Sequence, residues 1–195
     1  MSSLNVFEVF ASFQWEGIHL GKAHIFLRTA GCNLDCRYCD TRPARAAVPA
    51  ARVEVEPFTR KFEEVTNPIP VDRLRRLLRG LWRPGFHSLS LTGGEPLLQA
   101  EELADLLDVL GTECPPVYLE TNGTLPQAME ILVDRVGIVS MDVKLESVTG
   151  EASRLPEHCA FLAVTHPGQT FLKVVVCEGL DLDEMEEAVM ELGSL

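Results

Sequence analysis

Three closely spaced cysteines are the residues of this sequence best suited to chemistry. Cys32, Cys36 and Cys39 follow the pattern C-x3-C-x2-C within residues 31–41. Three thiolates can ligate three irons of a [4Fe–4S] cluster, and the fourth iron then stays free to bind a small molecule. An open iron of this kind indicates catalysis rather than electron storage alone.

A structural zinc site is the main alternative, because Cys36 and Cys39 form a C-x2-C pair. A closed zinc site needs four ligands, and no second Cys or His pair follows within the next forty residues. The other cysteines, Cys114, Cys159 and Cys177, lie in or beside apolar runs, and we expect them to be buried thiols. Six cysteines without a secretory signal in residues 1–20 indicate a reducing compartment, the cytoplasm. These observations favour a cluster over zinc or a disulfide.

A second candidate for ligand binding is the glycine pair Gly93-Gly94 with the carboxylate of Glu95. It follows an apolar run at residues 89–92. Glycines after a strand let the backbone approach a ligand closely, and an adjacent carboxylate can accept a hydrogen bond from an ammonium group. Alone, such a glycine pair is more often just a turn.

Composition is that of a soluble enzyme formed by a single domain, residues 1–195. Of the 195 residues 46% are hydrophobic and 24% are charged, enough to bury a core without disulfides. No apolar run approaches the roughly 20 residues of a membrane span. The 17 basic and 29 acidic residues give a net charge of −12, which disfavours a nucleic-acid partner.

Strands and helices are predicted to alternate along most of the chain. Apolar runs predict strands at 23–29, 88–92, 117–121, 137–143 and 171–176, and leucine periodicity predicts helices at 71–82, 100–110, 125–133 and 182–192. Strands separated by helices imply right-handed crossovers and a parallel sheet, and hence an α/β fold. Residues 42–70 lose this periodicity, so we expect an irregular insertion there, with one short hairpin at most and no chemistry of its own.

Polar motifs fall where four of the predicted strands end. They are Arg28 with the cysteine loop, residues 92–95, residues 120–123 and residues 142–144. Because the carboxyl ends of parallel strands meet at one edge of the sheet, we expect these motifs to form one site. Lys144, at the end of an apolar strand, either reaches into that site or lies at the surface.

The cysteine pattern, with Tyr38 in an aromatic position before Cys39, and the sequence G-G-E-P at residues 93–96 resemble the signatures of radical S-adenosylmethionine (SAM) enzymes. The resemblance implies a partial (β/α) barrel. It also implies that Cys32, Cys36 and Cys39 hold a [4Fe–4S] cluster, and that SAM is bound by Tyr38, Asp40, Gly94, Glu95 and Lys144.

Within that superfamily, the segments around the cysteines are similar to the 7-carboxy-7-deazaguanine synthase family. They read Q-W-E-G at residues 14–17, F-L-R at 26–28, G-C-N-L at 31–34 and C-D-T at 39–41, with Trp15 in place of the family's glycine. The resemblance implies a lyase of the queuosine and 7-deazapurine pathway that contracts 6-carboxy-5,6,7,8-tetrahydropterin to 7-carboxy-7-deazaguanine and releases ammonia. The implied substrate contacts come from Gln14, Trp15, Glu16, Arg28 and Thr92.

The same resemblance implies a Mg²⁺ ion at Thr41, a homodimer, and an electron donor such as flavodoxin or ferredoxin. The residue types suit a pterin, because a carboxylate can accept from ring N–H groups and an arginine fork can bind the substrate's carboxylate. The Thr41 hydroxyl is an oxygen ligand of the kind Mg²⁺ prefers, although it serves equally well as a turn cap. Two alternatives stay open: a radical SAM activase or modification enzyme acting on a protein or another small molecule, and a non-catalytic iron–sulfur or zinc binding module.

Overall fold

One sheet of eight strands forms the framework of the computed structural model, which describes residues 2–195. The strand order is β10-β9-β8-β7-β3-β2-β4-β5. The strands are β2 (Val6–Phe13), β3 (Ala23–Thr29), β4 (Ala50–Glu54), β5 (Phe62–Thr66), β7 (Ser88–Gly93), β8 (Val117–Thr121), β9 (Ile138–Val143) and β10 (Thr170–Val174). A second, two-stranded sheet pairs β1 (Ser3–Leu4) with β6 (Ile69–Pro70).

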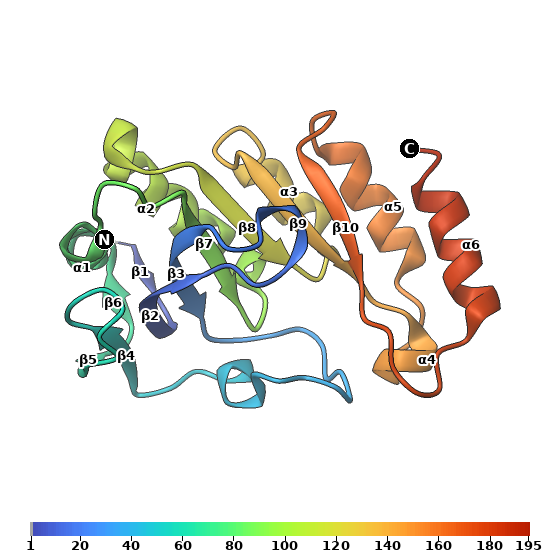
Figure 1. The fold of residues 1–195 in the computed structure, drawn as a ribbon, viewed down its shortest axis with the longest axis horizontal. Coiled ribbons are helices and arrows are strands. Elements are labelled where there is room, and N and C mark those ends of the chain that lie inside the picture. The colour runs from blue at the N-terminus through green and yellow to red at the C-terminus, as the bar shows by residue number, and fades with distance from the viewer. Residues whose placement is uncertain (1) are drawn as a thin grey trace.

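The five strands from β3 to β10 run parallel to one another, as the alternation of strands and helices predicts. The antiparallel pairs of this sheet are β2 with β3 and β4 with β5, whereas β2 and β4 run parallel to each other. Among residues 2–195 no pairing joins the edge strand β10 to the other edge, β5, so the sheet stays open. Figure 1 shows β10 and the C-terminal helices at one end of the molecule and β4, β5 and α1 at the other. The predicted α/β fold with a partial (β/α) barrel is confirmed.

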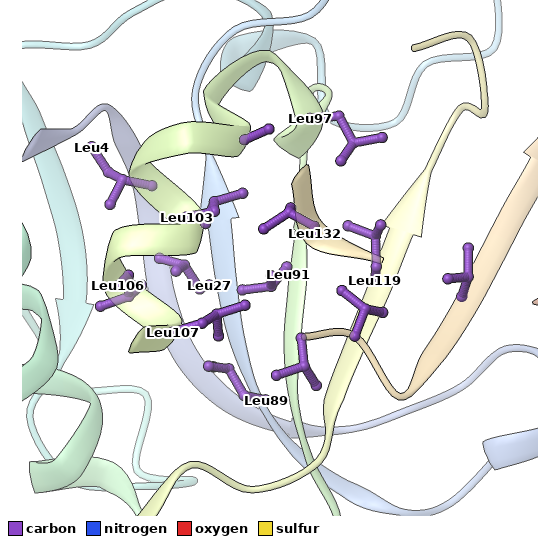
Figure 2. Packing of buried hydrophobic residues seen from close by; sticks show 14 of the residues in the cluster. Leu4, Leu27, Leu89, Leu91, Leu97, Leu103, Leu106, Leu107, Leu119 and Leu132 are labelled. Atoms are coloured by element: carbon purple, nitrogen blue, oxygen red, sulfur yellow. The ribbon is translucent and has the colours of Figure 1, made fainter. Parts of the chain in front are cut away.

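Helices cover the apolar side of the sheet. They are α1 (Val71–Leu81), α2 (Ala100–Leu110), α3 (Pro126–Leu132), α4 (Glu146–Thr149), α5 (Leu155–Val164) and α6 (Leu182–Leu192). Figure 2 shows the leucines of α2 in one buried cluster with Leu27, Leu89, Leu91 and Leu119 of the strands. Because side chains alternate along a strand, the residues between these leucines point to the opposite, concave side of the sheet.

Residues 42–70, predicted as irregular with one hairpin at most, contain that hairpin as β4 and β5. The hairpin is not separate from the fold, because β4 pairs in parallel with β2 and so extends the main sheet. Its buried face is made by Val53 and Val65, each 1% exposed. Arg52 and Glu64, which pair with each other on the other face, hide the strand signal from a search for apolar runs.

The elements that were not predicted are β2 and α5, together with the four-residue helix α4 and the two-residue strands β1 and β6. β2 alternates Val6 and Val9 on the buried side with residues such as Phe10 and Ser12 on the concave side, which is a strand pattern without an apolar run. The prediction that the remaining cysteines are buried is wrong: Cys177 is exposed, and Cys114 and Cys159 are half-buried at the edge of the core. None of the helices in residues 2–195 is both long and apolar enough to cross a bilayer.

Candidate active site

A cavity of about 390 Å³ opens on the concave side of the sheet, at the carboxyl ends of the parallel strands. It is lined by nearly all of the residues predicted for substrate, SAM, cluster and magnesium: Gln14, Trp15, Glu16, Arg28, Cys32, Cys36, Tyr38, Cys39, Asp40, Thr41, Thr92, Gly94 and Lys144. The predicted convergence of four strand-end motifs on one site is confirmed. Glu95 alone among the predicted residues lies behind the cavity wall, where it is 1% exposed.

The cysteine loop is fixed by main-chain hydrogen bonds at both ends. The Gly31 N–H donates to the Ala44 carbonyl over 2.8 Å, and the Arg37 N–H donates to the Thr149 carbonyl over 2.9 Å. Burial raises the pKa of both the Cys32 and the Cys36 thiol. At Cys36 the nearby Lys144 ammonium opposes this increase in pKa but does not cancel it. A metal that binds these thiols must therefore displace their protons.

The donor set fits an iron–sulfur cluster better than a single metal ion. All three thiols open onto the same cavity. Across residues 2–195, however, no three Cys, His, Asp or Glu side chains are placed to hold one metal ion. Three soft thiolates gathered on one cavity are the ligands that a polynuclear iron–sulfur cluster takes.

The Gly93-Gly94 segment packs directly on the cysteine loop. A Cβ atom built on Gly94 lies 2.1 Å from the Gly31 carbonyl oxygen and 2.9 Å from the Cys32 Cβ, distances that no side chain can occupy. Gly93 adopts a φ of +154°, and its Cβ position lies 2.5 Å from the Thr29 hydroxyl. The glycine pair therefore sets how closely the two halves of the site approach.

Glu95 ties the end of β7 to the end of β8. Its carboxylate accepts from the Asn122 N–H and the Thr121 hydroxyl at 2.8 Å, and from the Leu97 N–H at 3.0 Å. Burial raises the pKa of Glu95 to about 7, while the donors of Asn122, Leu97 and Thr121 lower it. The role predicted for Glu95 in SAM binding stays a prediction, because these groups already occupy its carboxylate.

Lys144 and Tyr38 face one another across the cavity wall. The Lys144 ammonium donates to Asp142 over 2.7 Å and to the Tyr38 hydroxyl over 3.0 Å. Burial by itself lowers the pKa of Lys144, but Asp142 and Tyr38 outweigh burial and raise it. Lys144 therefore presents a permanent positive charge to a ligand in the cavity, and it is not a surface lysine.

A second hydrogen-bond network links the predicted substrate residues through Glu120. Glu120 is the first residue of the predicted motif at 120–123. The Gln14 side-chain amide donates to one Glu120 oxygen and the Thr92 hydroxyl to the other, each over 2.8 Å. The Gln14 carbonyl oxygen accepts from the main-chain N–H groups of Trp15 and Glu16. Gln14, only 2% exposed, therefore positions the Trp15-Glu16 backbone against β8.

Arg28, which lines the cavity, is held in place by Glu8 and Thr41. Its Nε lies 3.0 Å from a Glu8 carboxylate oxygen, and its terminal nitrogen donates to the Thr41 hydroxyl over 3.4 Å. Thr41 also donates to Asp40 over 2.8 Å. Glu8 and Lys173 were not predicted as site residues, because each is a charged residue within a strand and needs the fold to bring it to the site, whereas Glu120 and Asp142 begin two of the predicted strand-end motifs.

Stacked rings close the concave side of the sheet below the cavity. The rings of His24 and His87 lie 5.5 Å apart and nearly parallel, and His19 lies 4.9 Å from His87. Tyr118 packs edge-on against His24 at 5.2 Å. His24 is fully buried, and its Nδ1 lies 2.7 Å from the Ser90 hydroxyl. Burial, together with His87 and His19, lowers the pKa of His24 to about 4.

This ring stack predicts an acid-sensitive fold. Between pH 6.5, the ordinary pKa, and about 4 the unfolded chain binds a proton at His24 and the folded chain does not. Stability is therefore complete above this window and falls as the pH drops through it, by about 3 kcal/mol from His24. Denaturant titrations at several pH values in this range measure how the free energy of unfolding depends on pH. His24→Asn should weaken this dependence. An unchanged pH dependence in that variant contradicts its assignment to His24.

Comparison with known proteins agrees with this geometry. Residues 26–177 match the model of the radical SAM superfamily. The chain is 42% identical to the 7-carboxy-7-deazaguanine synthase of Geobacter sulfurreducens over 174 residues, 88% of this chain and 69% of that one. It is 39% identical to the enzyme of the same name from Methanothermobacter thermautotrophicus over 141 residues, 72% of this chain and 49% of the relative.

A solved structure shares the fold. The crystal structure of QueE from Escherichia coli superimposes with a TM-score of 0.53 over 99% of this chain and 90% of that chain, at 18% sequence identity. At this identity the likeness concerns the fold alone. The strands that line the cavity are therefore arranged as in a known three-dimensional scaffold.

Proposed function

We infer the activity of this chain from its family, because the chain belongs to the radical SAM superfamily and, within it, to the 7-carboxy-7-deazaguanine synthase family. It is a radical SAM lyase that converts 6-carboxy-5,6,7,8-tetrahydropterin to 7-carboxy-7-deazaguanine with release of ammonia. One observation carries this proposal furthest: the cavity joins three cysteine thiols to polar side chains that suit a pterin.

The cofactors are a [4Fe–4S] cluster, SAM and Mg²⁺. When bound, they supply the electron and the carbon radical that start the ring contraction, and a cation that orients the substrate. We propose that Cys32, Cys36 and Cys39 hold the cluster, and that Thr41 contributes an oxygen ligand to Mg²⁺. SAM is assigned to Tyr38, Asp40, Gly94, Glu95 and Lys144.

The protein groups orient the substrate and exclude water. We assign ring N–H recognition to Glu16 and to the Glu120 carboxylate that Gln14 and Thr92 hold in place. The Arg28 guanidinium is assigned to the carboxylate of the pterin, and Trp15, 77% exposed at the rim, to the face of the ring. None of these groups needs to act as an acid or a base, so the protein contributes mainly position.

We further propose that residues 1–195 form a single radical SAM domain that works in the cytoplasm as a homodimer. Radical SAM chemistry needs an external electron, and flavodoxin or ferredoxin is the proposed donor. The small-molecule substrate agrees with the net charge of −12, which opposes binding to nucleic acid.

The direct test is an anaerobic assay of the reconstituted, reduced protein with SAM, Mg²⁺ and 6-carboxytetrahydropterin, followed by mass spectrometry. Formation of 7-carboxy-7-deazaguanine establishes the class and the substrate. 5′-Deoxyadenosine without that product keeps the radical enzyme and points to an activase or another substrate. Absence of both products leaves the binding-module alternative.

Arg28→Lys tests the assignment of Arg28 to the substrate. Lysine keeps the charge but loses the planar fork, so we expect the KM for the pterin to rise at least about tenfold. SAM cleavage without substrate should change by less than about threefold, because Arg28 is not assigned to SAM. Arg52→Lys is a matched control, since Arg52 also approaches Glu8, at 4.0 Å, but is largely exposed. Equal loss of both reactions in Arg28→Lys contradicts the assignment.

A further inference from the structure

Lys173 is a basic residue of the cavity that no sequence motif identifies. It lies on the edge strand β10, opposite Asp142 in the β9 register, and lines the cavity with its side chain 20% exposed. Its ammonium forms an ion pair with the carboxylate of Glu16, which is 51% exposed. The pair thus joins the loop after β2 to the far edge of the sheet.

The position of Lys173 is fixed by its neighbours. Phe171, two residues earlier on the same face of β10, packs against Tyr118 with ring centroids 6.2 Å apart. Its ring also lies so close to Gly17 that a Cβ atom there would be 2.5 Å away. Since Gly17 directly follows Glu16, this contact holds both partners of the ion pair in place.

The other cations around the cavity are paired with carboxylates that are not assigned to substrate. Arg28 is paired with Glu8, Lys144 with Asp142, and Arg45 with Asp35. The carboxylate of Glu16, by contrast, is assigned to the substrate ring in the proposed function. A ligand that binds Glu16 therefore also meets the Lys173 ammonium beside it.

We propose that Lys173 is a specificity-determining residue that reads the ring carbonyl of the substrate. This inference rests on the proposed function. The pyrimidine edge of a pterin presents two N–H donors and, next to them, a carbonyl acceptor. A carboxylate beside an ammonium is the complementary pair: Glu16 accepts from the N–H groups, and Lys173 donates to the carbonyl oxygen. Arg28 then binds the carboxylate at the other end of the molecule.

Two analogues that differ at this carbonyl provide the test. Equilibrium dialysis near neutral pH, with the cluster-loaded protein, compares 6-carboxypterin with 2,4-diaminopteridine-6-carboxylate, in which an amino group replaces the oxygen and N3 carries no hydrogen. An amino donor facing Lys173 and a bare N3 facing Glu16 are both disfavoured, so we expect the wild type to bind the oxo analogue about tenfold or more tightly than the diamino analogue. The share that belongs to Lys173 is the part of this preference that its substitution removes.

Lys173→Met should weaken binding of the oxo analogue about tenfold to a hundredfold and that of the diamino analogue by less than about threefold. Lys173→Gln keeps a hydrogen-bond donor, so its affinity for the oxo analogue should lie between those of the wild type and Lys173→Met. Leu172→Gln, on the opposite face of β10, is the matched control and should change neither affinity. Circular dichroism and the visible absorbance of the cluster verify that each variant is folded and loaded.

The outcomes separate this inference from the function on which it rests. If Lys173→Met and Lys173→Gln both keep the wild-type preference for the oxo analogue, Lys173 does not read the carbonyl, while the synthase activity stands. If Arg28→Lys alters the preference more than the Lys173 variants do, the two ends of the substrate are assigned in reverse. If the wild type binds neither analogue, the pterin assignment itself fails, and the role of Lys173 fails with it.

Discussion

Gly94→Ala is expected to abolish reconstitution of the cluster, although it adds a single methyl group. The new Cβ atom would lie 2.1 Å from the Gly31 carbonyl oxygen, a main-chain atom that cannot rotate away. Either the G-G-E-P loop or the cysteine loop must move, and the thiols of the latter then no longer share one cavity. We expect a loss of about 3 kcal/mol in the free energy of unfolding, at the upper end for overpacked sites.

Two measurements test Gly94→Ala. The iron bound per chain after anaerobic reconstitution measures cluster assembly, and urea unfolding of the apoprotein measures stability. Gly80→Ala is the control, because Gly80 is exposed on α1 and nothing lies within 4 Å of its Cβ position. That control should be stabilised by about 0.5–1 kcal/mol through helix propensity. Full iron loading of Gly94→Ala would show that the two loops separate freely, contrary to the packing described.

Glu95→Gln should lower the free energy of unfolding by about 2–4 kcal/mol, because a buried acceptor becomes partly a donor. Two N–H groups and the Thr121 hydroxyl all donate to this carboxylate. Glutamine can accept at only one of its two ends, so at least one of these donors is left facing an NH₂ group. Binding of SAM, measured by dialysis with the cluster-loaded protein, should weaken together with stability.

Glu101→Gln provides a matched control for this substitution. Glu101 lies in the first turn of α2 and is exposed, so loss of its charge should change stability by at most about 0.5 kcal/mol. A Glu95→Gln protein as stable as the wild type would indicate that Glu95 is not a structural link between β7 and β8. Its carboxylate would then be available to a ligand.

Much of the parallel half of the fold could be predicted because each of its elements carries its own local signal. β3, β7, β8 and β9 are short, largely buried apolar runs, and α1 and α2 show a clear leucine stripe. Element boundaries differ by a residue or two, as with β10, which begins at Thr170 and ends at Val174 rather than Val176. β2 escaped prediction because polar residues interrupt its apolar pattern, and the pairing of the β4–β5 hairpin with β2 has no signal in the local sequence.

The same distinction applies to the candidate site. Residues within the motifs of the two loops were predictable, since the spacing of Cys32, Cys36 and Cys39 has a chemical meaning by itself. Lys173 was not, because it lies more than 150 residues after Glu16 and becomes its partner only when β10 closes one side of the cavity. A charged residue in a strand gives no sign, before folding, of the face on which it lies.

Gln14 and Thr92 share the carboxylate of Glu120, and this limits which substitutions the site can accept. Gln14 and Thr92 donate to opposite oxygens of one carboxylate, so the three side chains are thermodynamically coupled. A single replacement leaves a buried polar group without its partner, whereas a concerted replacement of all three does not. Adaptation of this cavity to a differently shaped heterocycle is therefore expected to proceed by sets of compensating substitutions, and libraries that vary one position at a time will miss the functional combinations.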